Sequence, residues 1–302
     1  MNNEKKLNYR SHKRAILTKN IIIYTVLILL SVFWLIPFVY LLGQSFSSSY
    51  APRFFFPLIN PSEDLLAQGY PYFTFDNYVK LFTDDIYHFG IWYKNTLIIT
   101  SVTCVIETVL VLGTSYAFSR LRFKLRKPLM KLILVLSMFP GFLSMIIIYS
   151  ILKLIGLNGN IYSLILIYIG GSAMQYYIAK GFFDTIPRSL DEAAMIDGAN
   201  KNTIFFRVIM PLSKPIVVYT ALITFTGPWG DFMLPNFLAG GTDEARTVAV
   251  GLWRIVNDLT NRAVYFPFFC AGAVFVSVPI MILFFWLQRY YVEGITGGAV
   301  KG

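Results

Sequence analysis

A short polar stretch in the middle of the chain has the residue types and spacing best suited to a specific interaction. It reads Glu192-Ala193-Ala194-Met195-Ile196-Asp197-Gly198, and Pro211 follows thirteen residues after Gly198. Ser189 stands at the spacing of a capping box, in which Ser189 caps a helix and Glu192 bonds back to its amide. Gly198 is a suitable stop for that helix. Carboxylates beside small alanines predict an acidic helix that the backbone of another protein approaches closely. The alternative is a solvent-exposed loop helix in which Glu192 serves only the cap.

Long apolar segments on both sides of this stretch predict a membrane protein. The chain of 302 residues is 56% hydrophobic and 14% charged, whereas soluble domains are about 25% charged. Six segments have the roughly 20 residues that a helix needs to cross a bilayer: Ile21–Gly43, Thr96–Phe118, Leu129–Leu152, Tyr162–Phe182, Val208–Leu234 and Phe268–Leu287. The sequence thus predicts an all-α integral membrane protein with six transmembrane helices. These lie in one domain, residues 21–290, between an N-terminal tail (1–20) and a C-terminal tail (291–302).

The distribution of basic residues predicts how these spans are oriented. Nineteen of the 26 Lys and Arg residues fall on the side that holds both termini and Glu192–Gly198. Because loops rich in Lys and Arg stay in the cytoplasm, both termini are predicted to be cytoplasmic. The external side then holds Pro235–Pro267 and Ser45–Asn95, a sizeable loop between the first two helices. The same bias accounts for the net charge of +10, so we predict contact with membrane lipid and none with nucleic acid.

Residue types that catalyse reactions or bind metals are scarce in the sequence. Cys104 and Cys270 each lie in an apolar run, where free thiols act as small hydrophobic groups. His12 and His88 are too few and too far apart for a zinc site or for a catalytic pair within the spans. The phosphate-binding pattern G-x-x-x-x-G-K-[ST] does not occur, although Gly294–Gly302 is rich in glycine. We therefore predict no metal, no cofactor and no enzymatic activity in this chain.

The polar stretch closely resembles the EAA motif of importer permeases of the ATP-binding-cassette (ABC) class. That pattern reads Glu-Ala-Ala, three residues, Gly, nine residues and Ile-x-Leu-Pro, and here Val208 and Met210 replace its Ile and Leu. Other stretches resemble the carbohydrate-uptake branch of these permeases and, at the C-terminus, the second, shorter permease subunit of maltose-type importers. They are Tyr116–Phe123, Met138–Pro140, Gly181–Pro187 and Gln288–Gly302.

The resemblance implies a bacterial importer built from several subunits. Glu192–Gly198, with Pro211 after it, would be a cytoplasmic coupling helix seated on one of two separate ATPase subunits, which bind ATP and Mg. A second homologous permease subunit would complete the pathway, and an extracellular solute-binding protein would deliver an oligosaccharide, with malto-oligosaccharide the best match. A further contact with the ATPase would be made by Gly294, Gly297, Gly298 and Lys301. A loop that helps the binding protein to release sugar would include Leu252, Trp253, Arg254 and Asn257.

Polar residues within the spans are candidates for the translocation pathway. A carboxylate at mid-span costs about 2.5–3.5 kcal/mol, so Glu107 is a functional candidate by default. It either lines the cavity and bonds sugar hydroxyls or pairs with a polar group across the bundle, and we favour the pairing. Gln175, Trp229 and Asp231 are further candidates, and Trp229 is either a sugar-stacking ring or an interfacial anchor.

An ion-driven secondary transporter of small solutes is the alternative function. That class usually shows inverted repeats and several ionisable groups in mid-membrane. The sequence has one clear acid within a span, Glu107, and no internal repeat. It therefore favours the ABC importer permease.

Overall fold

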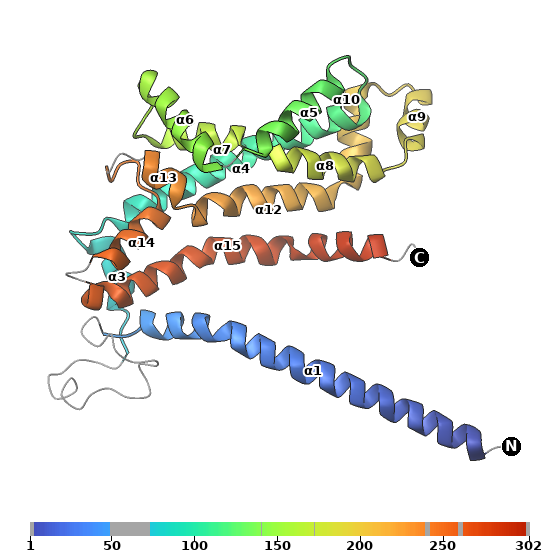
Figure 1. Cartoon of the computed structure of the whole chain (residues 1–302), viewed down its shortest axis with the longest axis horizontal. Helices are drawn as coiled ribbons and strands as arrows, with labels where there is room; N and C mark the ends of the chain where they lie inside the picture. The colour runs from blue at the N-terminus through green and yellow to red at the C-terminus, as the bar shows by residue number, and fades with distance from the viewer. Residues whose placement is uncertain are drawn as a thin grey trace. The chain divides into compact units, whose positions relative to one another are not determined.

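The structure is helical wherever it describes regular elements. The computed structural model describes residues 3–48, 73–139, 141–171, 173–238, 242–258 and 262–299 (Figure 1). In chain order the helices are α1 (Asn3–Ser45), α3 (Asp76–Thr83), α4 (Phe89–Arg120), α5 (Arg126–Ser137), α6 (Gly141–Leu154), α7 (Ile161–Gly170), α8 (Ala173–Thr185), α9 (Ser189–Ile196), α10 (Lys201–Thr203), the π-helix η1 (Ile204–Ile209), α11 (Met210–Leu212), α12 (Lys214–Gly230), α13 (Met233–Leu238), α14 (Val248–Asn257) and α15 (Arg262–Ala299). The all-α prediction is confirmed for these residues.

Three of the described helices are long and apolar enough to cross a membrane, and two bent pairs bring the number of candidate spans to five. The single helices are Ile16–Ser45 in α1, Phe89–Arg120, and Tyr265–Gln288 in α15. The pairs are α7 with α8, and Lys201–Leu212 with α12. The prediction of six spans thus stays a prediction.

The third predicted span, Leu129–Leu152, is two helices in the structure rather than one. α5 ends at Ser137, and α6 begins at Gly141. The sequence has Pro140 at the interruption. Proline lacks an amide hydrogen and disfavours helical geometry in the residue before it, so a break at this point has a direct cause.

The chain divides into two compact units, and the smaller one contains α1. It comprises Met1–Val79 and Ala263–Val274. Within it, the Asn77 side-chain amide donates hydrogen bonds to the carbonyl oxygens of Ser45 at 3.0 Å and Ser47 at 2.6 Å. The Ser45 hydroxyl also lies 2.7 Å from the Tyr78 hydroxyl. These bonds fasten the end of α1 to the first turn of α3.

The larger unit, Lys80–Arg262 with Phe275–Gly302, is built around α4. α4 packs against α12, α8 and α7. Figure 1 shows these helices beside α4. Two buried apolar clusters lie along its length. The first joins α4, α6, α7 and α13 through Ile99, Leu152, Leu164 and Leu238. The second joins the C-terminal half of α4 to α8, η1 and α12 and includes Val111, Leu112, Tyr116, Ala179, Phe183, Ile186, Ile204, Ile209 and Ile216.

Polar side chains follow one face of α4 between these clusters. The buried members, spaced mostly three, four or eight residues apart, are Thr96, Thr100, Thr103, Glu107, Ser115 and Ser119. The Ser115 hydroxyl donates to the Tyr176 carbonyl at 3.0 Å, and the Cys104 thiol to the Ala221 carbonyl at 3.4 Å. Small polar residues let apolar helices approach closely and bond across the contact. This face therefore fixes how α8 and α12 lie on α4.

Candidate coupling and docking sites

The predicted polar helix is present as α9, but its N-terminus is not capped as the sequence predicts. Ser189 is the first helical residue, Arg188 occupies the N-cap position, and no side chain there bonds the helix. The Leu190 amide already donates to the Pro187 carbonyl at 3.3 Å, and the Glu192 amide to the Arg188 carbonyl at 3.1 Å. The turn thus begins one residue earlier than a Ser189 cap requires, so the capping-box prediction is wrong.

α9 ends at Ile196, with Asp197 as its C-cap, and Gly198 follows as the predicted helix stop. Gly198 has a φ of +82°, in the left-handed region that only glycine enters at low cost. Its amide donates to the Met195 carbonyl at 3.0 Å, and the Ala199 amide to the Ala194 carbonyl at 2.9 Å. This pair of bonds is a Schellman motif, which satisfies the last carbonyl groups of the helix and reverses the chain.

Side chains of α9 divide into an exposed and an inward set. Glu192, Ala193 and Asp197 are exposed, and Ile196 is 86% exposed. Asp191 is buried, and Ala194, the second alanine of the motif, packs against the apolar cluster of α4, α8 and η1. The face that α9 presents outward is therefore a small apolar tip between two carboxylates.

The C-terminal end of α4 holds α9 through one buried ion pair. The Arg120 guanidinium lies 3.3 Å from the Asp191 carboxylate, and the two side chains are 6% and 10% exposed. The same guanidinium donates to the carbonyls of Phe183 at 3.0 Å and Ile186 at 2.7 Å. Beside it, the Ser119 hydroxyl donates to the Asp184 carboxylate at 2.6 Å. The ends of α4 and α8 and the start of α9 thus share one set of polar contacts.

The chain from α9 to α12 is short and sharply bent. It passes through α10, the π-helix η1 and α11, and the axis turns by 82° before α12. Pro211 lies in α11, next to the bend. The Ser213 hydroxyl donates to the Ile209 carbonyl at 2.7 Å. α9 packs against η1, so it is joined to α12 along the chain and by packing.

The four candidates for the translocation pathway lie in separate places along the bundle. Gln175 donates a hydrogen bond from its amide to the buried Glu107 carboxylate at 3.2 Å, across α8 and α4. Trp229 is 3% exposed, and its ring lies against Tyr93, 5.5 Å between centroids. Asp231 accepts a bond from the Tyr168 hydroxyl at 2.9 Å and borders a mostly apolar cavity of about 310 Å³. Only Glu107 and Gln175 are brought together.

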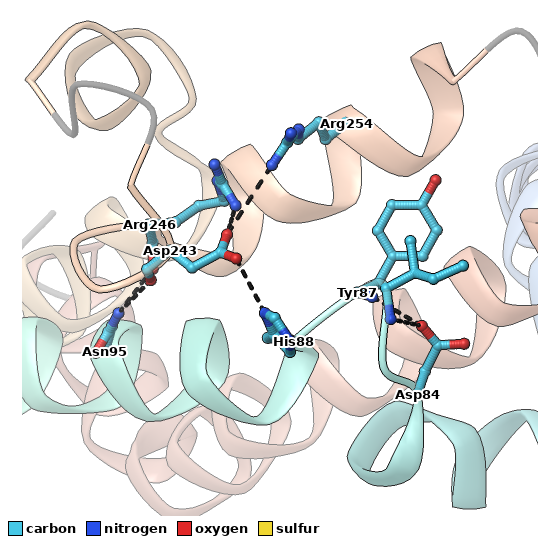
Figure 2. Close-up of polar contacts among 8 residues, drawn as sticks. Asp84, Tyr87, His88, Asn95, Asp243, Arg246 and Arg254 are labelled. Atoms are coloured by element: carbon cyan, nitrogen blue, oxygen red, sulfur yellow. Dashed lines mark hydrogen bonds and ion pairs between the residues drawn. The ribbon is translucent and has the colours of Figure 1, made fainter.

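A polar cluster surrounds Asp243 at the N-terminal end of α4. Figure 2 shows this carboxylate between His88, Arg246 and Arg254. The His88 imidazole nitrogen lies 2.9 Å from it, and the Arg254 guanidinium 3.9 Å. Arg246 pairs with it, and its buried guanidinium also lies 5.6 Å from the centre of the Trp92 ring, a cation–π distance. Burial lowers the pKa of Arg246, and the nearby Arg254 charge adds to that effect.

Backbone contacts complete this end of α4. The Asn95 side-chain amide donates to the carbonyls of Glu244 at 2.9 Å and Arg246 at 3.0 Å, as Figure 2 shows in part. The Thr96 hydroxyl accepts a bond from the Val248 amide at 2.9 Å, at the start of α14. Together these bonds hold the segment before α14 on the first turns of α4.

α14 itself presents a mixed surface outward. Trp253, Arg254 and Asn257 are exposed, whereas Leu252 is buried. The three exposed residues border a cavity of about 420 Å³, whose other walls include Tyr87 and Asp258. The Tyr87 hydroxyl donates to the Asp258 carboxylate at 2.6 Å. The cavity thus combines aromatic, amide and charged groups.

Comparison with known proteins identifies the family of the chain. The model of the family "Binding-protein-dependent transport system inner membrane component" matches residues 109–297. The chain belongs to this family.

Relatives of this permease include permease proteins of sugar transport systems. A galactooligosaccharides transport system permease of Bacillus subtilis (strain 168) is 41% identical over 231 residues, 76% of this chain and 81% of the relative. A maltodextrin transport system permease of Streptococcus pneumoniae is also 41% identical, over 76% and 80%. A trehalose/maltose permease of Thermococcus litoralis is 30% identical over 94% and 98%. One solved structure, of an ABC transporter for alginate import, has the same fold, with a TM-score of 0.72, 21% identity and coverage of 92% and 98%.

The family assignment confirms the main functional prediction. The permease is an integral plasma-membrane subunit of a binding-protein-dependent ABC importer for carbohydrates, and it is a transport subunit rather than an enzyme. This class excludes the ion-driven alternative. The predicted C-terminal contact with the ATPase includes three glycines that are part of α15, Gly294, Gly297 and Gly298. Its fourth residue, Lys301, lies outside the described residues.

Several residues that organise the ends of α4 were not among the predicted site residues of the permease. Arg120 follows the second predicted span by two residues, and Asp191 directly precedes the EAA motif. A basic residue just beyond a span normally reaches water, so no sequence pattern indicates that Arg120 is buried. Asn95 carries no sequence signal because its side chain bonds backbone carbonyls. The contact of Asp243 with His88 joins residues 155 positions apart and was not predictable either.

Proposed function

We propose that this permease imports malto-oligosaccharides or closely related oligosaccharides, driven by separate ATPase subunits that bind ATP and Mg. A maltodextrin permease and a galactooligosaccharide permease, each 41% identical to this chain, support the sugar class. A second homologous permease subunit and an extracellular solute-binding protein complete the complex. One of the solved structures of similar fold is an alginate ABC transporter in complex with a periplasmic protein, which supports a partner of this kind.

We propose that α9 is the coupling helix and that its exposed face docks on an ATPase. The observation that carries this proposal is that face: Ile196 is 86% exposed, between the exposed carboxylates of Glu192 and Asp197. A helix of about two turns is not stable alone in water. α9 is held from behind by Asp191 and Ala194, which leaves the outward face free for a partner. The excess of Lys and Arg in the loops on this side supports a cytoplasmic location for α9 and for both termini.

The opposite end of α4 then faces the outside of the cell. There Trp253, Arg254 and Asn257 are exposed on α14 and border the cavity of about 420 Å³. We propose that these residues meet the solute-binding protein, whereas Leu252 fixes α14 from within. Glu107 and Gln175 would lie at mid-membrane depth in the pathway, where their mutual bond holds α8 on α4. Trp229 and Asp231 would lie toward the outer end.

Uptake by the reconstituted complex tests the proposed function. Proteoliposomes that contain both permease subunits and the ATPase would be given the binding protein with labelled maltotriose, and a galacto-oligosaccharide and an alginate oligosaccharide in parallel. Uptake should require internal ATP and should withstand an ionophore. Uptake that survives ATP depletion and collapses with the ionophore would contradict the proposal.

A variant series tests the assignment of α9. Glu192→Ala together with Gly198→Val should release the ATPase from the complex and abolish uptake while the permease stays in the membrane. Val at a φ of +82° is strongly disfavoured, so the turn after α9 should not form. Lys124→Met, in the exposed loop after α4, is the matched control. Normal ATPase retention in the α9 variant would place the docking surface elsewhere.

A further inference from the structure

The Arg120 side chain joins the C-terminal end of α4 directly to both α8 and α9. One terminal nitrogen of its guanidinium faces the Asp191 carboxylate at 3.3 Å. The other donates to the carbonyls of Phe183 at 3.0 Å and Ile186 at 2.7 Å. A guanidinium has five donors spread over three nitrogens in a rigid plane, so one terminal nitrogen faces the carboxylate while the other serves two carbonyls. The three donors of a lysine share one nitrogen and do not reach acceptors that are spread in this way.

The partners of Arg120 lie where α8 ends and α9 begins. Phe183 is in the last turn of α8 and Ile186 directly follows the helix. The last carbonyl groups of a helix lack intrahelical partners and carry partial negative charge, and here the Phe183 carbonyl also accepts the Ile186 amide at 3.3 Å. Neither oxygen of Asp191 accepts a hydrogen bond of good geometry from the residues that the structure describes. The carboxylate is nevertheless buried, so the Arg120 charge is what offsets its loss of water.

Direct packing between α4 and α9 is limited at this point. A cavity of about 330 Å³ opens beside the ion pair, with Tyr116 and Arg120 on one wall and Asp191 and Glu192 on another. Ala194 touches the apolar cluster of which Tyr116 is a member. α9 otherwise packs against η1, which leads to α12. α9 is therefore attached to η1 by packing, to α12 along the chain, and to α4 chiefly through the Arg120 side chain.

We propose that Arg120 is a positioning residue that transmits movement of α9 to α4. The inference rests on the proposed docking of the ATPase on α9. A displacement of α9 reaches α12 along the chain, but it reaches α4 through a buried ion pair, and breaking such a pair leaves a charge without compensation. With Arg120 in place, α9 and the ends of α4 and α8 move as one body. Without it, ATP hydrolysis would move α12 while α4 lags behind.

The test separates this role from mere stabilisation by replacing the ion pair with an apolar pair. Arg120→Met with Asp191→Leu leaves no buried charge unpaired, so the complex should assemble with its ATPase and with nearly unchanged thermal stability. In proteoliposomes with the binding protein and labelled maltotriose, we expect the sugar imported per ATP hydrolysed to fall at least tenfold. Arg120→Lys should fall between this variant and the wild type, because one nitrogen replaces two. Lys124→Met is the control for loss of a basic residue.

Three outcomes would overturn the proposal. The first is a wild-type ratio of imported sugar to hydrolysed ATP in the apolar double variant. The second is that every variant loses stability in proportion to its loss of that ratio. The third is that Arg120→Lys has a ratio no higher than that of the double variant. The proposed function has its own readout in this series. If wild-type complexes retain no ATPase, the proposed docking of the ATPase is wrong. If they retain it and the Arg120 variants import as much sugar per ATP as the wild type, only the positioning role is wrong.

Discussion

The two ends of α4 each hold a short helix, but they do so in different ways. At the N-terminal end, α14 is held by close packing of Gly251 on Trp92 and by bonds from Asn95 and Thr96 to backbone groups. At the C-terminal end, α9 depends on the Arg120–Asp191 ion pair beside a cavity. The first attachment is spread over many contacts, and the second is concentrated in one.

This difference matches what each end would have to do in an importer. A distributed, packed contact resists small displacements, because every neighbour must shift together. A contact concentrated in one long side chain tolerates changes in the cavity around it while it keeps the distance between two helices. With the orientation proposed above, the N-terminal end of α4 would hold an external surface still, and the C-terminal end would pass on a movement from the cytoplasm.

The largest loss of stability should come from removing one partner of the Arg120–Asp191 ion pair. Asp191→Asn leaves the Arg120 guanidinium, 6% exposed, without its charge partner. Breaking a buried pair in this way typically costs about 3–5 kcal/mol. The apparent melting temperature of the purified complex should fall clearly, with retention of the ATPase measured in parallel. Asp85→Asn, on an exposed loop, is the control, and an equal effect of both variants would mean that Asp191 has no special place.

The next largest loss of stability should come from overpacking the contact between α14 and α4. A Cβ atom on Gly251 would lie 1.9 Å from the Trp92 ring, and that ring is 1% exposed. Gly251→Ala should therefore push α14 from α4 at a cost of about 1–3 kcal/mol. Thermal unfolding would measure the loss, and binding of the solute-binding protein should weaken with it. Gly113→Ala in α4, where a Cβ meets nothing within 4 Å, should be neutral or slightly stabilising.

A smaller loss should follow from removing one set of hydrogen bonds at the same end. Asn95→Ala removes the bonds to the carbonyls of Glu244 and Arg246, at about 1 kcal/mol each. Asn95→Asp should be worse than alanine, because a carboxylate would face two carbonyl oxygens. The order of the two melting temperatures is the measurement. Equal values would show that the side chain does not face these carbonyls in solution.

Prediction from the sequence succeeded where local patterns decide the structure. The EAA stretch forms a helix that stops at Gly198, because a positive φ is readily available only to glycine. Length and apolar character identified α1, α4 and α15 as spanning candidates. Prediction failed where backbone geometry at a helix start decides: the turn at Pro187 begins the helix too early for Ser189 to act as its cap.

The contacts at the ends of α4 could not be predicted, for a different reason. Arg120 bonds carbonyl groups, and every residue has a carbonyl, so no residue pattern marks the partners. The sequence does not distinguish Asp191 from Glu192, the acid that directly follows it, although the first is buried and the second is exposed. Only the position of α4 beside α9 turns one of these acids inward, and that position follows from packing across distant parts of the chain.

The smallest effect should come from replacing His88, an exposed residue of the polar cluster around Asp243. His88 lies 2.9 Å from Asp243, but their side chains are 44% and 34% exposed, and water and salt screen such pairs. His88→Ala should change stability by about 0–1 kcal/mol, less than either Asn95 variant, and the difference should shrink further at high salt. Melting curves at low and high ionic strength would show this. A loss as large as that of Asp191→Asn would mean that α14, like α9, depends on one ionic contact, and the contrast between the two ends of α4 would disappear.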